Sequence, residues 1–283
     1  MTIVPLFWTS EYSKIHGDDH QVIETESGLL PVGRAVSETL KSPGRATFGG
    51  FWIEPNKTFK YTEQTVRQLK AYSEVSSQIR ITFPPSYFHP EVFQEQVSYF
   101  TNKCYSLITE TNFHIVVEHR NDVSKGNRKK QRQFCERGGS VSQVEKPDWH
   151  SVYKLLVENR LRRGVQLSMP WHIFERGLVD RPDDFTIWGA TLGSEFVGGA
   201  LTVAINSNTL YVLFWGDTLL GRNLSVVASI CETLIEFCID KNYRVLDLGI
   251  SSIDGLLDEN LAKFKINLGA VQTSKTSMTV NLA

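Results

Sequence analysis

The feature that most constrains this chain is a change of hydrophobic period near Gly216. Before that point, apolar and polar residues alternate in three runs that are separated by polar links of two or three residues. Alternation of period two predicts strands, and links this short predict hairpins, so the three strands should be antiparallel. The runs cover residues 185–192, 195–205 and 209–215.

After Gly216 the period becomes 3.6, which predicts a long helix over residues 223–241. Its apolar positions are Val227, Ile230, Cys231, Leu234, Ile235 and Cys238. This face must pack on the sheet. A strand over 243–249, a helix over 258–268 and a last strand over 270–282 should follow. A hairpin meander followed by this alternation predicts an α/β (α+β) fold that differs from a doubly wound nucleotide fold.

The N-terminal half repeats part of this order more weakly, as expected for an internal duplication. Its predicted elements are a strand at 48–53, a helix at 61–76, a strand at 78–83, a helix at 90–103 and one or two strands at 105–118. A chain of 283 residues can hold two compact units. We therefore predict an N-terminal unit over 1–119, a connecting helix over 120–138 and a C-terminal unit over 139–283.

The connecting segment is basic, although the whole chain is nearly neutral. Residues 120–137 carry seven Lys or Arg side chains against two acids, whereas the full sequence has 30 basic and 31 acidic residues. Two interpretations stay open. The segment is a solvated connecting helix, or it is an anion site for the phosphates of a substrate or of RNA.

Other function classes are disfavoured by composition. The four cysteines form no C-x-x-C pair and no metal-ligand spacing with histidine. No window has the roughly 18 uninterrupted apolar residues of a membrane helix. The first ten residues lack a basic flank and a cleavage site, so we expect no export signal and a cytoplasmic protein.

Several segments resemble one superfamily. They are S-K-G-N-R-K-K at 124–130, E-N-R-L-R-R-G at 158–164, L-Y-V-L-F-W-G at 210–216, L-D-L-G-I-S-S at 246–252, L-A-K-F-K-I-N-L-G-A at 261–270 and A-T-F-G-G-F at 46–51. The chain resembles the GNAT acyltransferases, and within them the FemAB-like, double-GNAT branch of bacterial proteins. This resemblance implies two tandem GNAT-like units, each a mixed, mostly antiparallel sheet flanked by helices, with a degenerate N-terminal unit.

The resemblance also implies an N-acyltransferase. Acyl-CoA would be the co-substrate, no cofactor or metal would be bound permanently, and the acceptor would be the amine of an amino sugar or amino acid derivative. Two alternatives stay open. One is aminoacyl transfer from charged tRNA. Relatives that use such a donor often carry a long helical arm, and no segment of this sequence is long enough for one. The other is a non-catalytic binding module with a decayed phosphate loop, because only Gly221 fits the loop pattern and Phe264 replaces a tyrosine that many members use.

Donor binding is predicted at the start of the 223–241 helix. Gly221, Arg222 and Asn223 should present free backbone N–H groups and the positive helix end to the phosphates, with Arg222 as an added cation. The alternative is a plain polar turn. Trp215 is a further candidate for cofactor binding, although core packing is the commoner role of such an aromatic residue.

Catalysis is predicted at and beyond the strand 243–249. Asp247 lies mid-strand among apolar residues, where a carboxylate is costly to bury unless it is paired or functional. It is either a general base or amine ligand, or the partner of Arg160 in a structural ion pair. Ser251 and Asp254 follow at the strand's C-terminal end, where ligand contacts are common, although a serine there also caps turns. We predict a catalytic role for Ser251 and a substrate contact for Asp254.

Lys263 and Lys265 cannot share a helix face, since two residues correspond to about 200° of rotation. One of them should face inward, and the resemblance implies that it is Lys265, as a catalytic residue. Arg160 lies near the end of a helix that the apolar spacing predicts over residues 149–163, and it either stabilises that end or binds substrate.

The other predicted substrate contacts are Arg128 and Tyr211. Arg128 belongs to the basic segment. Even spacing places Tyr211 on the same strand face as Trp215, where core packing is the commoner role.

Overall fold

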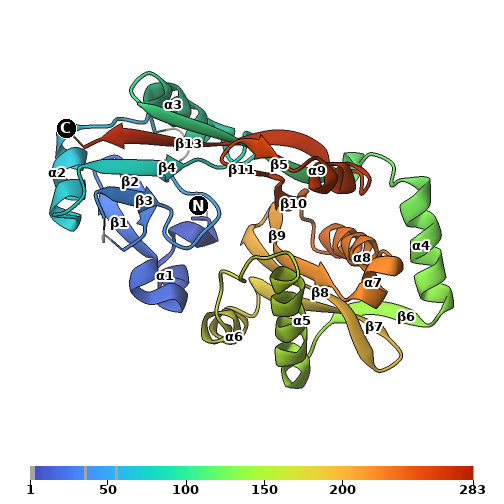
Figure 1. The fold of residues 1–283 in the computed structure, drawn as a ribbon. Helices are drawn as coiled ribbons and strands as arrows, with labels where there is room; N and C mark the ends of the chain where they lie inside the picture. Colours follow the sequence, from blue (N-terminus) through green and yellow to red (C-terminus); the bar gives the residue numbers. More distant parts are fainter. Residues whose placement is uncertain (1–3, 35–36, 55–56, 283) are drawn as a thin grey trace. The chain divides into compact units, whose positions relative to one another are not determined.

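A computed structural model describes residues 4–34, 37–54 and 57–282. The chain divides into two compact units (Figure 1). The first unit comprises Met1–Asn112, Ile250–Asp258 and Thr273–Ala283, and the second comprises Phe113–Gly249 and Glu259–Gln272. Strands β5 (Ser106–Val116) and β13 (Val271–Asn281) contribute residues to both units.

In the first unit, β5 and β13 are followed in sheet order by β4 (Gln78–Thr82) and β3 (Thr39–Ser42). β3 and β4 are parallel, and β13 pairs antiparallel with β4. The remaining elements are the hairpin of β1 (Gln21–Thr25) and β2 (Gly28–Val32), and the helices α1 (Ser10–His16), α2 (Glu63–Tyr72) and α3 (Pro90–Thr101). Thr62 caps α2 through its side chain, and Pro90 begins α3, as is typical of these residues at helix N-termini.

The unit boundary predicted at residue 119 differs from the structure, where the division falls between Asn112 and Phe113 inside β5. The predicted C-terminal unit was also continuous, yet the end of the chain returns to the first unit. Ser277 to Asn281 pair with Thr82 to Gln78 of β4. This pairing joins residues about 200 positions apart, so no local pattern indicates it.

In the second unit, the sheet order is β13, β5, β10, β9, β8, β7 and β6. The strands not yet given are β6 (Gly139–Gln143), β7 (Phe185–Leu192), β8 (Glu195–Asn206), β9 (Thr209–Asp217) and β10 (Val245–Ile250). β7 to β9 form the predicted antiparallel meander, and β6 pairs antiparallel with β7. β9 and β10 lie side by side and are parallel, which confirms the predicted neighbourhood of these two strands.

Helices cover both faces of this sheet. α5 (Trp149–Leu161), followed by α6 (Trp171–Asp180), lies on one face, and α8 (Val226–Asp240) lies on the other (Figure 1). Two successive glycines of β8 show this directly, because a Cβ atom on Gly198 would meet Val226 and one on Gly199 would meet Val152 of α5. Glycine at both positions therefore lets two helices approach the same strand closely.

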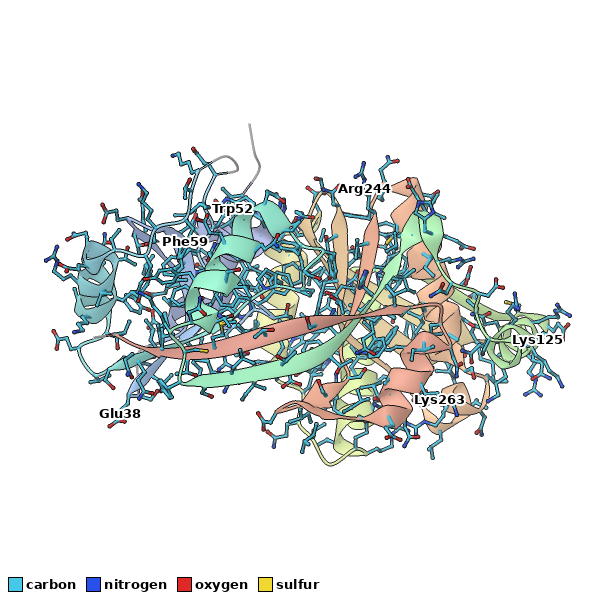
Figure 2. The ribbon with its side chains drawn as sticks, turned by 90° about the horizontal axis from the view of Figure 1, so that it is seen from above. Glu38, Trp52, Phe59, Lys125, Arg244 and Lys263 are labelled. Atoms are coloured by element: carbon cyan, nitrogen blue, oxygen red, sulfur yellow. The ribbon has the colours of Figure 1, made fainter. Side chains whose placement is uncertain are left out.

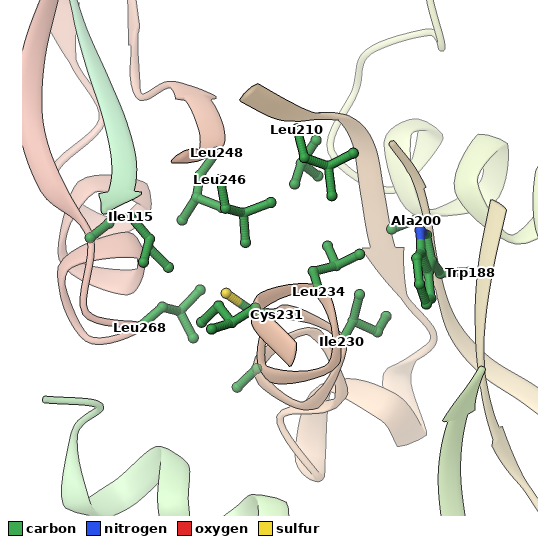
Figure 3. Packing of buried hydrophobic residues seen from close by; sticks show 14 of the residues in the cluster. Ile115, Trp188, Ala200, Leu210, Ile230, Cys231, Leu234, Leu246, Leu248 and Leu268 are labelled. Carbon is green, nitrogen blue, oxygen red and sulfur yellow. The ribbon is translucent and has the colours of Figure 1, made fainter. Parts of the chain in front are cut away.

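The core of the second unit lies between the sheet and α8 (Figure 3). It contains Leu210, Leu246 and Leu248 from the strands and the predicted apolar face of α8. Cys231 and Cys238 are buried in it, as predicted, and burial raises the pKa of both thiols. α4 (Lys125–Glu136) and α9 (Glu259–Ile266) complete the unit.

Two local expectations were wrong. The strand predicted at 48–53 forms only an isolated bridge between Leu29 and Trp52, because the amide of Gly50 bonds to the Ser42 side chain and that of Gly49 bonds to the end of β4. The sequence analysis also missed α1 and β1 to β3, where apolar periodicity is weak. Within the described ranges, no helix is long and apolar enough to cross a membrane.

Candidate functional site

A row of polar side chains crosses three neighbouring strands of the second unit. His114 on β5, Asp247 on β10 and Tyr211 on β9 are 7%, 0% and 7% exposed. Asp247 and Tyr211 are direct partners in the parallel pair. Their strand neighbours point into the α8 core, namely Phe113, Ile115, Leu210, Val212, Leu246 and Leu248. Since side chains alternate along a strand, the polar row faces the opposite side, which α5 covers at β7, β8 and β9.

The Asp247 carboxylate is buried but has polar neighbours. Its Oδ1 atom accepts a hydrogen bond of 2.7 Å from the Gly249 amide. Burial lowers the pKa of His114, and the charge of Asp247 opposes that shift. The imidazole is therefore mostly neutral at pH 7 and lies close enough to a carboxylate for the two groups to interact. This is the arrangement of a base with a group that stabilises its protonated form.

Lys265 is buried and faces inward, as predicted. Lys263, which is labelled in Figure 2, is exposed. The Lys265 ammonium group donates a hydrogen bond of 2.8 Å to the Gly249 carbonyl and lies 5.8 Å from the centroid of the Phe113 ring. Gly249 thus binds Asp247 through its N–H group and Lys265 through its C=O group. It adopts a φ of 75°, a left-handed conformation that favours glycine.

Arg160 approaches the polar row from α5. Its guanidinium lies 5.9 Å from the centroid of the Phe214 ring, and it interacts electrostatically with Tyr211. Burial lowers the pKa of Arg160, with the nearby charge of Arg163 acting in the same direction. The structure therefore places Arg160 beside Tyr211 and the aromatic part of β9, on the face that carries the polar row.

β9 and β10 separate next to this row. Their pairing ends at Tyr211 and Asp247, although β9 continues to Asp217 and β10 to Ile250. β9 also contains a bulge against β8, where Leu201 pairs with Phe214 but Thr202 pairs with Val212. Bulges of this kind redirect side chains and are common beside active sites.

The bulge corrects the prediction that Tyr211 and Trp215 share a face. Trp215 packs against the α8 core and makes an edge contact with Phe264 of α9, with ring centroids 6.0 Å apart. Tyr211 instead approaches Gly249, since a Cβ atom there would lie 2.9 Å from its hydroxyl. The extra residue, Leu213, reverses the alternation between the two aromatic side chains.

The predicted donor loop does not start the long helix. A short helix, α7 (Leu219–Asn223), contains Gly221, Arg222 and Asn223, and α8 begins only at Val226 after Ser225 with a φ of 51°. The amides of Gly221 and Arg222 bond to the side chain and carbonyl of Thr218. These two N–H groups of the predicted cradle therefore already have acceptors. A Cβ atom on Gly221 would lie 2.0 Å from the Val197 carbonyl, so close packing requires this glycine.

A carboxylate occupies the same region. Asp217, at the end of β9, accepts hydrogen bonds from Asn159 at 3.0 Å and from Arg222 at 3.4 Å, and its backbone carbonyl accepts one from Arg162. The cation predicted to hold a donor phosphate thus already has an anionic partner. The residues at 217–223 therefore fit the diphosphate of coenzyme A poorly.

Ser251 and Asp254 fall in the segment Ile250–Asp258 of the first unit. The Ser251 hydroxyl is buried and has no hydrogen-bond partner among the described residues. Asp254 is exposed in the turn between the short strands β11 (Ser252–Ile253) and β12 (Leu256–Leu257). The Ser252 hydroxyl binds the Glu110 carboxylate and accepts from the Thr111 amide, which anchors the base of this hairpin.

Arg128 lies on α4, which contacts α8 and β6, 3.9 Å from Asp122. It lines a pocket of about 260 Å³ together with Arg120 and Gln131. The structure thus assigns it to a different surface from the polar row.

His114 is the residue that the sequence analysis missed. A usable signal was present, because a histidine lies between apolar residues in F-H-I-V, just as Asp247 lies in V-L-D-L. The bulge at Leu213 had no such signal.

Neither a family model nor a curated protein sequence matches this chain. Solved structures do match its fold. FemX has a TM-score of 0.62 and 13% identity over 96% of this chain and 91% of its own. The C-terminal domain of a protein assigned as a lysylphosphatidylglycerol synthetase, from Agrobacterium fabrum, has a TM-score of 0.61 and 11% identity over 96% and 88%. L-PGS from Bacillus licheniformis has a TM-score of 0.61 and 11% identity over 93% and 84%.

These similarities concern the fold. The predicted fold class is confirmed, since the chain forms a mixed α/β fold in which a large mixed sheet is flanked by helices.

Proposed function

We propose that the chain transfers an activated acyl or aminoacyl group to an amine. The observation that carries this proposal is the buried pair of Asp247 and His114 at the point where β9 and β10 separate. An amine must lose its proton before it attacks a carbonyl carbon. A mostly neutral imidazole can accept that proton, and the carboxylate stabilises the imidazolium that results.

Two further groups, Lys265 on α9 and Tyr211 of the row, have roles in the same step. As the amine nitrogen bonds to the carbonyl carbon, negative charge develops on the carbonyl oxygen, and the Lys265 ammonium supplies positive charge at the end of β10. The bond from that carbon to the leaving oxygen or sulfur then breaks. The leaving atom takes a proton. The candidate donor is the Tyr211 hydroxyl, because Phe264 stands where many members of the GNAT superfamily have a tyrosine.

An aminoacyl ester is favoured as the donor over acyl-CoA, the first expectation from the sequence. The amides of Gly221 and Arg222 are engaged, and Asp217 places a carboxylate beside Arg222. An RNA-linked ester makes no demand for a compact diphosphate cradle at this loop. The fold shared with a protein assigned as a lysylphosphatidylglycerol synthetase supports the same choice.

The alternative of a non-catalytic binding module accounts for the altered loop. It gives no reason for a buried carboxylate and a buried ammonium group in one unit, both of which are costly without a chemical role. For the acceptor we retain an amino sugar or amino acid derivative.

The test measures transfer of a radiolabelled group to glucosamine, lysine and related amines. The donors are acetyl-CoA and a mixture of charged tRNAs. We expect product from the tRNA mixture, and at least a hundredfold loss of it in Asp247→Asn and in His114→Gln. Lys263→Met is the control, since that side chain is exposed. Product from acetyl-CoA alone would restore acyl-CoA as the donor, and full activity in both site variants would refute the proposed roles.

A further inference from the structure

A single face of α4 carries four cations. Lys125, Arg128, Lys129 and Arg132 follow the spacing i, i+3, i+4 and i+7, which places them on one side of a helix, and all four are exposed. We call these four residues the α4 stripe. It extends for about 10 Å at a rise of 1.5 Å per residue. Lys125 marks its beginning in Figure 2.

The stripe works against the stability of its own helix. Lys125 and Lys129, and likewise Arg128 and Arg132, are like charges four residues apart, and each such pair costs about 0.2–0.5 kcal/mol. The first turn contains no acidic residue, although the positive end of a helix favours one. A face that merely keeps a helix in solvent can mix both signs, yet this one carries a single sign from Lys125 to Arg132 and is followed by Glu136 only at the end of the helix.

A pocket lies at the N-terminal end of the stripe and shares Arg128 with it. The pocket has a volume of about 260 Å³ and is lined mainly by polar side chains, including Arg120, Asn121 and Gln131. Its two arginines differ in their pairing. Arg120 bonds to Glu232 at 2.8 Å, whereas the Asp122 carboxylate lies 3.9 Å from Arg128, beyond hydrogen-bond distance.

From the stripe and this pocket together, we propose that α4 is a docking surface for the phosphate backbone of an RNA. An anionic membrane fits less well, because an interfacial helix needs an exposed apolar face. The apolar side chains of α4 are Phe134, which is buried, and Cys135. A polyanion without an apolar interior is therefore the better match. The inference builds on the proposed function, since an RNA-linked donor would require such a contact.

The experiment measures the anisotropy of fluorescein-labelled, uncharged bulk tRNA at 50–300 mM KCl with the full chain. Four phosphate contacts predict that log affinity falls with log salt with a slope of about −3. The variant Lys125→Glu/Lys129→Glu/Arg132→Glu should lose at least tenfold in affinity at 100 mM salt and most of the salt slope. Its melting temperature should be unchanged or higher, because Lys125→Glu places a negative charge in the first turn of the helix and Arg132→Glu turns one like-charge pair into a pair of opposite charges.

A matched control changes the net charge by the same amount on the first unit. The variant Lys14→Glu/Lys60→Glu/Lys70→Glu replaces three exposed lysines and should bind RNA within about twofold of the parent chain. Equal losses in the two triple variants would overturn the proposal, as would unchanged binding in the stripe variant. Stripe-dependent binding to phosphatidylglycerol vesicles without RNA binding would assign the surface to a membrane and also overturn it.

Two further variants keep the result decisive. Lys125→Gln/Lys129→Gln removes two charges without reversal and should lower affinity about threefold to tenfold, which tests the stripe even if the triple variant does not fold. Asp247→Asn should bind RNA like the parent chain. Stripe-dependent binding without any detectable transfer would refute the proposed reaction and leave the docking surface standing. Transfer from charged tRNA that is unchanged in the stripe variants would refute the docking surface and leave the proposed reaction standing.

Discussion

Lys265→Met should separate activity from stability. The Lys265 side chain is 2% exposed, and its ammonium group makes a 2.8 Å hydrogen bond with the Gly249 carbonyl, 5.8 Å from the Phe113 ring centroid. Methionine has a similar length and no charge, so it can fill the same space. The substitution therefore removes the positive charge from the end of β10 with little change in packing.

The expected magnitudes follow from what is removed. A hydrogen bond to a charged group contributes about 1.5–3 kcal/mol, and losing that amount only in the transition state lowers the rate by about 10-fold to 150-fold. For stability two effects oppose each other. The Gly249 carbonyl loses its donor, which costs about 1–3 kcal/mol, while a buried charge no longer has to be desolvated, which is often stabilising by a similar amount. The free energy of unfolding should therefore change by less than about 2 kcal/mol.

Transfer rates and urea unfolding curves of the same preparations test this. Lys263→Met, two residues away and exposed, is the control and should alter neither quantity. A Lys265→Met variant that transfers at the rate of the parent chain would refute the role of the ammonium group. A variant that loses more than about 4 kcal/mol of stability along with its activity would show that Lys265 mainly holds the fold together.

Three further predictions concern stability. Burial lowers the pKa of His20 from 6.5 to about 4, so between pH 6.5 and pH 4 the unfolded chain binds a proton that the folded chain does not. The free energy of unfolding should therefore fall by up to about 3 kcal/mol from pH 7 to pH 4, and His20→Gln should reduce that fall in urea titrations. Gly249→Ala should destabilise by about 1–2 kcal/mol and lower transfer, because φ is 75° and the new Cβ atom would press on the Tyr211 hydroxyl, whereas an unchanged melting temperature would exclude this strain. Gly221→Ala should lower the free energy of unfolding by about 3 kcal/mol or more in thermal unfolding, since its Cβ atom would lie 2.0 Å from the Val197 carbonyl. An unchanged stability would mean that α7 can move away from β8.

Many strands and helices of the second unit were predictable because each has a clear local period of apolar residues. Each strand of the meander and the face of α8 that enters the core follow from the spacing of apolar residues. The start of α8 was not predictable in this way. Residues 219–223 have helical character, and the break comes from Ser225 in a left-handed conformation, for which a serine gives no warning.

The candidate site was predictable only as separate residues. Asp247 was found because a charge in an apolar segment is costly, and that argument needs no knowledge of neighbours. Lys265 was chosen over Lys263 by the family resemblance. Which groups they contact depends on strand order, which places β5 beside β10 and so brings His114 next to Asp247. The bulge that separates the faces of Tyr211 and Trp215 is likewise a property of the β8 and β9 pairing.

The two sides of the candidate site differ in how completely they are built. On the acceptor side, Gly249 holds a carboxylate through its N–H group and an ammonium group through its C=O group, and neither charge is exposed. Such a pair would be replaced by apolar residues at little cost if it served stability alone. On the donor side, Asp217 already neutralises Arg222. The proposed transferase, with a prepared proton acceptor and a closed phosphate loop, would hold its donor elsewhere, and the α4 stripe is a strongly basic surface of the second unit that suits a donor with many phosphates.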